Sequence, residues 1–162
     1  MSAGGTPPRA ARAGRLDPAD AAFPDVVSDV LRSGHSVRFC AKGASMHPTI
    51  REGEPITVSP VRPADIRRGD VILYRVGRGV IAHRVVRTTR RPEGTLVFLP
   101  RGDALWTSDE PVEESGVLGR VVAVERGGRT LDPSALRARA LACARAGASR
   151  LLRWLRTRLP GF

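Results

Sequence analysis

Ser45 lies in the stretch CAKGASMHPTI (residues 40–50), where its hydroxyl follows a Gly-Ala pair and precedes Met46. A serine in a glycine-containing turn is usually structural, because tight turns select both residue types. It acts as a nucleophile only where the chain also supplies a base, a partner that orients the base, and a scaffold that holds them together. With those groups present, the chemistry would be attack of the serine oxygen on a carbonyl carbon.

The candidate bases are one lysine and three histidines. Lys42 is only three positions before Ser45, on the approach to the turn, so it cannot supply a base from elsewhere in the fold. His35 is typical of a solvated turn, and His47 lies beside the serine without a rigid support. His83 interrupts the apolar run VIAHRVV, where an imidazole is costly unless it is hydrogen-bonded. A lone histidine in a strand is more often structural, so His83 alone leaves its role open.

The elements that must position these groups follow a period of two. Short apolar runs alternate with turns rich in Gly, Pro, Asp and Arg, and a short helix ending at Gly34 precedes them. The pattern predicts a mainly β fold, a compact antiparallel barrel or sandwich. The predicted strands are SVRFCAKG, EPITVSPV, DVILYRV, GVIAHRVVRTT, TLVFLPRG and GVLGRVVAVER.

The two ends of the chain differ from this β domain. Residues 1–22 are rich in Ala, Gly, Pro and Arg and are predicted to form a disordered lead-in. Residues 132–162 begin with a helix N-cap, Asp132, and predict an amphipathic helix with leucines and Trp154 on one side and arginines on the other. That helix would lie either on an anionic membrane surface or against the β domain.

Length and composition limit the function classes. A chain of 162 residues favours one domain, and its formal net charge of +11 permits an acidic lipid or nucleic-acid partner, although a solvated arginine-rich surface explains the charge equally well. Cys40 and Cys143 have no metal-ligand spacing, so we expect no metal, no cofactor and a reducing compartment. The sequence has neither an apolar run long enough to span a membrane nor the apolar segment of an export signal. We therefore expect a cytoplasmic protein or one peripheral to the membrane.

Four ordered blocks between about residues 36 and 126 carry a resemblance to a known family. They are GASMHPTI, RRGDVILYR with IAHRVV, RGDALWTSDEPV, and VLGRVVAV. Together they resemble the type I signal peptidases and the related LexA-type self-cleaving repressors. The base of the bacterial signal peptidases is a lysine at the position of IAHRVV, whereas the endoplasmic-reticulum type has a histidine there. The sequence resembles the histidine branch, which implies a serine peptidase domain over residues 23–131.

The resemblance implies a role for each matching residue. Ser45 would attack the scissile carbonyl, and His83 would accept its proton. Asp103 and Asp109 match the two aspartates associated with the histidine, and either could orient the ring. Asp103 is slightly favoured because it directly follows the strand LVFLPRG. Asp70, at the start of a predicted strand, is interpreted as structural.

Residues around Ser45 are expected to bind the substrate and the oxyanion, namely Gly43, Ala44, Met46 and Pro48. Many family members have a hydroxyl residue where this chain has Gly43, so backbone N–H groups would have to stabilise the oxyanion. The sequence also lacks the transmembrane anchor that signal peptidases normally have. This puts the ordinary trimming of exported preproteins in doubt.

Three function classes follow from these observations. The favoured one is a serine endopeptidase with an Asp-assisted Ser–His mechanism, acting on a signal-like or leader-like segment of a peptide or preprotein. A repressor-like self-cleaving regulator is disfavoured because only the segment 24–34 is available for a DNA-binding helix pair before the β domain. The third is an inactive β scaffold that binds an anionic membrane or nucleic acid, and nucleic acid is the least expected partner.

Overall fold

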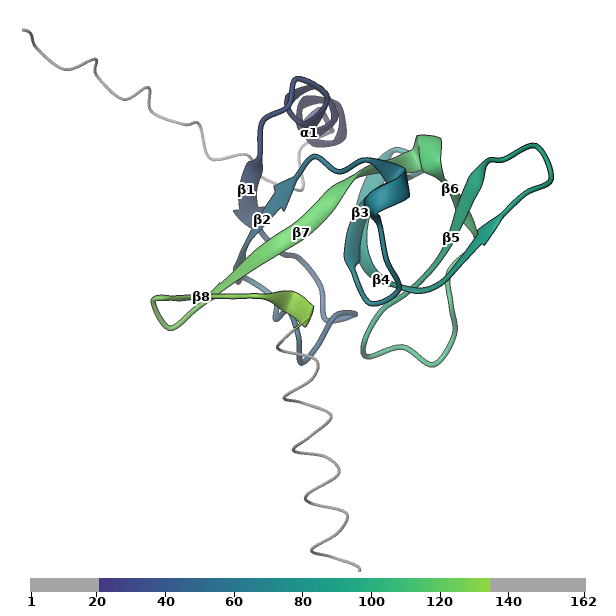
Figure 1. Cartoon of the computed structure of the whole chain (residues 1–162). Helices are drawn as coiled ribbons and strands as arrows, with labels where there is room; N and C mark the ends of the chain where they lie inside the picture. Colours follow the sequence, from purple (N-terminus) through teal and green to yellow (C-terminus); the bar gives the residue numbers. More distant parts are fainter. Residues whose placement is uncertain (1–20, 135–162) are drawn as a thin grey trace, which may run out of the picture.

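The computed structural model describes residues 21–134, which form an antiparallel sheet with one α-helix beside it (Figure 1). The strand order is β1-β2-β7-β3-β4-β5-β6, and β8 pairs with β7. The predicted antiparallel β fold is thus confirmed, but the sheet is open, with β1 and β6 at the two ends of this order. The elements are α1 (Phe23–Arg32), β1 (Val37–Cys40), β2 (Pro55–Ser59), β3 (Val71–Val76), β4 (Gly79–Arg90), β5 (Leu96–Arg101), β6 (Val112–Glu113), β7 (Val117–Arg126) and β8 (Arg129–Leu131), with short 3-10 turns at Pro63–Asp65 and Glu114–Gly116.

Helix α1 packs on the β sheet through its apolar face. Pro24 is in the first turn, where a missing N–H costs no helical hydrogen bond, and Val27 and Leu31 are buried on the inner side. The ring of Phe23 meets Phe39 of β1 edge-on, with centroids 5.0 Å apart. The helix ends before Gly34, as predicted, and Phe23 in its first turn lines the cleft described below.

The β3–β4 hairpin separates two apolar clusters. Because side chains alternate along a strand, Val80 and Ala82 of β4 pack with the larger cluster, and Ile81 and Val85 pack with the smaller one. His83 pairs with Ile72 in the sheet register and so lies on the face of the smaller cluster. The next residue, Arg84, therefore has its side chain on the opposite face.

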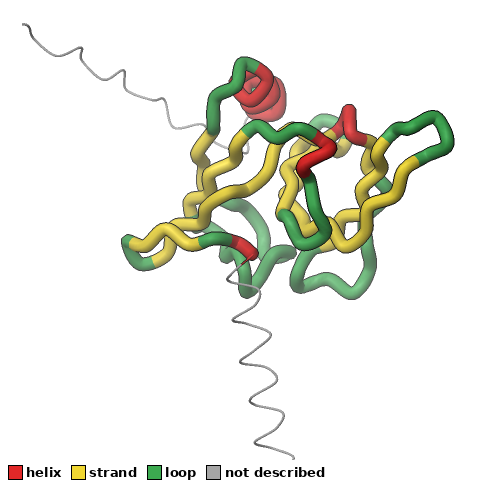
Figure 2. Tube along the Cα trace, viewed as in Figure 1, coloured by secondary structure: helices red, strands yellow, loops and turns green. Residues whose placement is uncertain are grey.

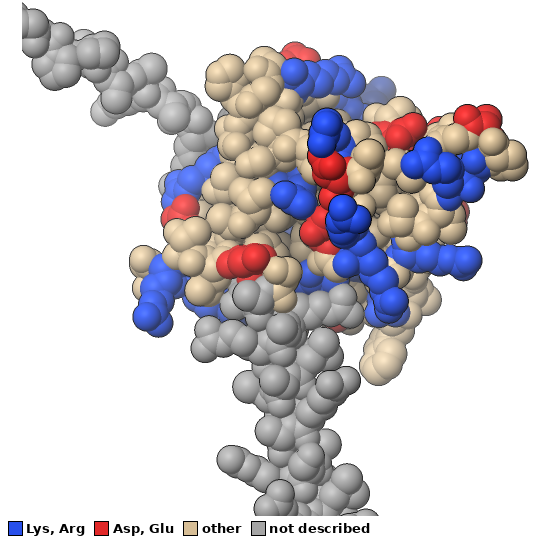
Figure 3. Space-filling view, in the orientation of Figure 1, with Lys and Arg blue, Asp and Glu red and all other residues tan. Residues whose placement is uncertain are grey.

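The loop that carries Ser45 and the loop that carries Asp103 and Asp109 meet at one end of the sheet. The segment that follows β1 and the segment between β5 and β6 lie side by side there (Figure 2), joined by a hydrogen bond from the Ala104 N–H to the Ser45 carbonyl at 2.9 Å. On the molecular face in Figure 3, basic side chains are interspersed with acidic ones. Arg62 and Asp65, and Arg91 and Glu113, are two of the exposed ion pairs.

Several predictions concern residues outside the described range. These are most of the lead-in (1–22) and most of the C-terminal helix (132–162), so the domain boundaries and the membrane contact of that helix stay predictions. The start of the helix is partly described: the Asp132 carboxylate accepts hydrogen bonds from the backbone N–H and the hydroxyl of Ser134, each at 2.7 Å. Within residues 21–134, no helix has the length and apolar character needed to cross a membrane.

Candidate active site

Ser45 sits in a turn held by its buried neighbours. Gly43 has a φ of 82°, a left-handed conformation that favours glycine, and it lets the chain reverse just before the serine. Met46 and Ile50 are buried, and the Ile50 N–H donates to the Met46 carbonyl at 2.9 Å. Gly102 passes so close to the turn that a β-carbon there would lie 2.6 Å from the Ser45 carbonyl oxygen. The serine is therefore positioned by packing on both sides.

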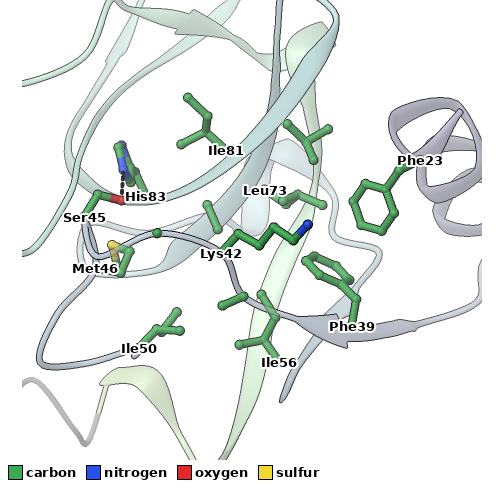
Figure 4. A pocket seen from close by; sticks show the side chains of 14 residues that line it. Phe23, Phe39, Lys42, Ser45, Met46, Ile50, Ile56, Leu73, Ile81 and His83 are labelled. Atoms are coloured by element: carbon green, nitrogen blue, oxygen red, sulfur yellow. Dashed lines mark hydrogen bonds between the residues drawn. The ribbon is translucent and has the colours of Figure 1, made fainter. Parts of the chain in front are cut away.

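His83 joins Ser45 and Asp109 into one chain of hydrogen bonds. Its Nε2 lies 2.8 Å from the Ser45 Oγ (Figure 4), and its Nδ1 lies 2.5 Å from the Asp109 Oδ2. An ionised carboxylate only accepts hydrogen bonds, so the ring proton belongs on Nδ1 and the Nε2 lone pair faces the serine hydroxyl. The histidine is 4% exposed. This is the arrangement in which a neutral imidazole can remove a proton from serine.

Asp109 has a second donor, Tyr74 of β3, which the sequence motifs do not identify. The Tyr74 hydroxyl donates to the Asp109 Oδ2 at 2.7 Å, and it lies 3.4 Å from the His83 Nδ1. Burial, followed by the Asp109 carboxylate, raises the pKa of the Tyr74 phenol, which therefore stays protonated and remains a donor. The available signal was a tyrosine inside an apolar strand, because a buried hydroxyl needs a partner.

Asp103 binds Arg84 and Thr49. Its carboxylate accepts two hydrogen bonds from Arg84, at 2.7 and 2.8 Å, and one from the Thr49 hydroxyl at 2.6 Å. Arg84 is only 1% exposed and also donates to the Gly69 carbonyl at 2.5 Å. The sequence analysis favoured Asp103 slightly as the carboxylate on the histidine, but the structure places Asp109 there. The reason is that Asp103 lies on the Arg84 side of β4, where it ties the serine turn to the sheet.

A cleft of about 360 Å³ opens beside the side chains of Ser45 and His83. Ser45 and His83 are part of its wall, and the side chain of Lys42 runs along it away from Ser45, toward the rings of Phe23 and Phe39 (Figure 4). The other lining residues are mostly apolar: Ala41, Gly43, Met46, Ile50, Ile56, Leu73, Val80, Ile81 and Ala82. An extended peptide segment with small or apolar side chains fits the character of this surface.

The remaining predicted residues lie around the turn. Gly43 and Met46 line the cleft, whereas Ala44 and Pro48 are exposed and do not belong to its lining. The Pro48 carbonyl instead accepts a hydrogen bond from Arg126 at 3.2 Å. Asp70 accepts from the Arg67 N–H at 2.9 Å just before β3 begins, which is the contact of a turn residue. Within residues 21–134, no group of three or more His, Cys, Asp and Glu side chains could hold a metal ion.

The other two histidines are not part of this chain of hydrogen bonds. The His35 Nδ1 lies 3.1 Å from the hydroxyl of Ser33, at the end of α1. His47 is exposed, and its backbone N–H donates to the Ala44 carbonyl at 3.0 Å. The ring that the described structure places on Ser45 is therefore that of His83.

The histidine of β4 thus lies between a turn serine and a loop aspartate on an open antiparallel sheet, within hydrogen-bond reach of both. The chain belongs to the family described as "Peptidase S24-like", whose model matches residues 9–122. It is also similar to the proteins named "Signal peptidase complex catalytic subunit SEC11C" of Homo sapiens, Mus musculus and Canis lupus familiaris, at 28% identity over 89 residues in each case. The aligned stretch covers 54% of this chain and 46% of each relative, so the chain spans about half the length of these relatives.

Proposed function

We propose that this protein is a serine endopeptidase in which Ser45 is the nucleophile, His83 the general base and Asp109 the carboxylate that orients the base. The observation that carries the proposal is the continuous chain of hydrogen bonds from the Ser45 hydroxyl through His83 to Asp109, at the wall of an apolar cleft. Nucleophile, base and orienting group within hydrogen-bond reach are what acyl transfer requires. Membership of a peptidase family supports the same reaction class.

The reaction begins when the Ser45 Oγ bonds to the scissile carbonyl carbon and its proton passes to the His83 Nε2. The Nδ1 proton stays on the ring, where Asp109 stabilises the imidazolium charge. The imidazolium then gives its proton to the leaving amine as the C–N bond breaks, which leaves an acyl-enzyme on Ser45. A water molecule, deprotonated by the now neutral His83, attacks the ester carbonyl. The C–Oγ bond then breaks, His83 returns the proton to the Ser45 Oγ, and the acid product is released.

Backbone N–H groups of the serine turn would stabilise the oxyanion in this mechanism. Gly43 has no hydroxyl to donate, so the turn of residues 43–46 has to provide the donors from its main chain. Loss of one such donor typically costs about 3 kcal/mol of transition-state stabilisation. The buried Met46 and the close approach of Gly102 hold this turn in a fixed conformation, as preorganised donors require.

The proposed substrate is an exposed, extended peptide segment of the signal or leader type. The apolar lining of the cleft supports small or apolar residues next to the scissile bond. The SEC11C relatives are named as catalytic subunits of a signal peptidase complex, which supports the same substrate class here. Because the chain spans about half of those relatives, this extension is part of the proposal.

The test is covalent labelling followed by cleavage. A fluorophosphonate probe should add one adduct to Ser45, found by mass spectrometry, and the protein should cut a peptide library after small residues. Ser45→Ala and His83→Ala should each lose nearly all activity, because members of a nucleophile–base unit act together. His47→Ala is the matched control and should keep most of the rate. An unlabelled Ser45, or a His83→Ala variant as active as the wild type, refutes the proposal.

A further inference from the structure

Tyr74 is the only tyrosine of the chain, and it lies on the same face of the β3–β4 hairpin as His83. The sheet register pairs Tyr74 with Ile81 and Ile72 with His83, so the tyrosine and the histidine are diagonal neighbours. Their ring centroids are 6.4 Å apart. The phenol of Tyr74, on β3, therefore lies close to the imidazole of His83, on β4.

Both of these side chains donate to one oxygen atom. The Asp109 Oδ2 receives the Tyr74 hydroxyl at 2.7 Å and the His83 Nδ1–H at 2.5 Å. The tyrosine is buried and its backbone is part of β3, so its hydroxyl is a fixed donor. Two fixed donors on one oxygen define the direction of the carboxylate far better than one does.

Asp109 needs such a fixed donor more than a strand residue would. It belongs to the loop between β5 and β6, where its own N–H donates to the Pro100 carbonyl at 3.0 Å. Its side chain is 26% exposed, and with Tyr74 it lines a second pocket of about 500 Å³ that also contains Glu110 and Glu113. Solvent that reaches this side of the carboxylate competes with His83 for its oxygens, so a fixed protein donor is needed to keep Asp109 on the histidine.

We propose that Tyr74 is a positioning residue of the reaction: its hydroxyl holds the Asp109 carboxylate on His83. The inference rests on the proposed peptidase function and adds one residue to its machinery. A phenylalanine would fill the same apolar space in the cluster around Ile72 and Phe98, so packing alone does not explain the hydroxyl. In the structure, that hydroxyl is directed at Asp109.

The kinetic test is Tyr74→Phe alone and combined with Asp109→Asn. Tyr74→Phe should lower kcat about tenfold, the effect of losing one charge-assisted hydrogen bond, with KM unchanged because the cleft lining does not include residue 74. In the Asp109→Asn background the same change should alter kcat less than twofold, because the carboxylate that it serves is already gone. Equal losses in both backgrounds, or no loss in either, overturn the inference.

The matched control is Ser28→Ala, which also deletes a buried hydroxyl. Ser28 is in α1, and within residues 21–134 its hydroxyl has no hydrogen-bond partner. This variant should keep the wild-type kcat. A loss in Ser28→Ala as large as that in Tyr74→Phe would show that removal of any buried hydroxyl harms the protein, and the inference would fail.

A second measurement detects the contact between Tyr74 and Asp109 independently of catalysis. Because Tyr74 is the only tyrosine, biosynthetic replacement by 3-fluorotyrosine gives a single ¹⁹F resonance from this position. The resonance should shift in Asp109→Asn and stay unchanged in Ser28→Ala. If Ser45-dependent cleavage occurs but Asp109→Asn does not move the resonance, the inference fails and the peptidase function stands. If the resonance moves but the protein neither reacts with the probe nor cleaves, the peptidase function fails, and the positioning role of Tyr74 in the reaction fails with it.

Discussion

Replacing each of the two aspartates near the serine turn by asparagine should have a different effect: mainly a loss of stability at Asp103 and mainly a loss of activity at Asp109. Asp103 accepts three hydrogen bonds from Arg84 and Thr49, and its partner guanidinium is almost completely buried. Asp103→Asn keeps the shape of the side chain but removes the charge that compensates Arg84. Asp109→Asn leaves this ion pair intact and removes the carboxylate that holds the Nδ1 proton of His83.

The magnitude for Asp103 follows from its burial. Removing one partner of a buried ion pair costs about 3–5 kcal/mol, because the other charge is left uncompensated. A small domain is stable by about 5–15 kcal/mol, so Asp103→Asn should remove a large part of the folding free energy and lower Tm by roughly 10–20 °C. Asp109 is partly exposed, and its substitution should cost about 1 kcal/mol of stability but on the order of 10³–10⁴ in kcat.

The assay measures thermal unfolding and single-turnover cleavage for both variants at a temperature where both are folded. Asp65→Asn is the control, since Asp65 pairs with Arg62 in an exposed ion pair whose loss should leave the unfolding temperature nearly unchanged. The reasoning is refuted if Asp103→Asn unfolds at the wild-type temperature but is inactive while Asp109→Asn keeps its rate. That result would mean that Asp103 is the residue that orients His83.

Two further predictions concern the loop that carries the serine. The bond from Arg126 lowers the pKa of Glu54, so this carboxylate contributes stability above its ordinary pKa of about 4.3 and loses that contribution as pH falls through the lowered value. Glu54→Gln should therefore have a lower free energy of unfolding than wild type by chemical denaturation at pH 7. This difference in free energy should become smaller toward pH 3, and a difference that is constant with pH contradicts the argument. Gly102→Ala should lower activity strongly because its β-carbon would lie 2.6 Å from the Ser45 carbonyl oxygen. Gly79→Ala is the control and should be tolerated, since the nearest contact of its β-carbon is at 3.7 Å. Equal activity of the two variants in the cleavage assay would contradict this prediction.

The strands that the sequence predicts are those long enough to show alternation. All six predicted apolar runs correspond to strands, including the 12-residue β4 that carries His83. The prediction missed β6 and β8, which have two and three residues, because no period can be recognised over so short a run. Their pairing is set by the neighbouring strands, which local sequence does not encode.

The sequence predicts the site residues that a motif identifies by their position. It does not predict the residues whose partners depend on the path of a loop. Ser45 and His83 follow from the motif resemblance, and the structure brings them to 2.8 Å. The choice between Asp103 and Asp109 depends on which side of β4 each part of the loop passes, and spacing from the preceding strand carries no information on that. Tyr74 and Arg84 escaped notice because each is a polar residue in an apolar strand whose partner lies in that same loop.

The alternation of β4 explains why the two loop aspartates contact different partners. His83 and Arg84 are consecutive, so their side chains lie on opposite faces of the strand, and each requires a carboxylate on its own side. A register slip of one residue between β3 and β4 would exchange the two faces and bring the guanidinium toward the serine. The register is fixed next to them by the Val85 N–H, which donates to the Asp70 carbonyl at 2.8 Å, and by Gly69, whose carbonyl accepts from Arg84 at 2.5 Å. These two bonds to the segment before β3 therefore accompany the β3–β4 register in which His83 Nε2 lies 2.8 Å from the Ser45 Oγ.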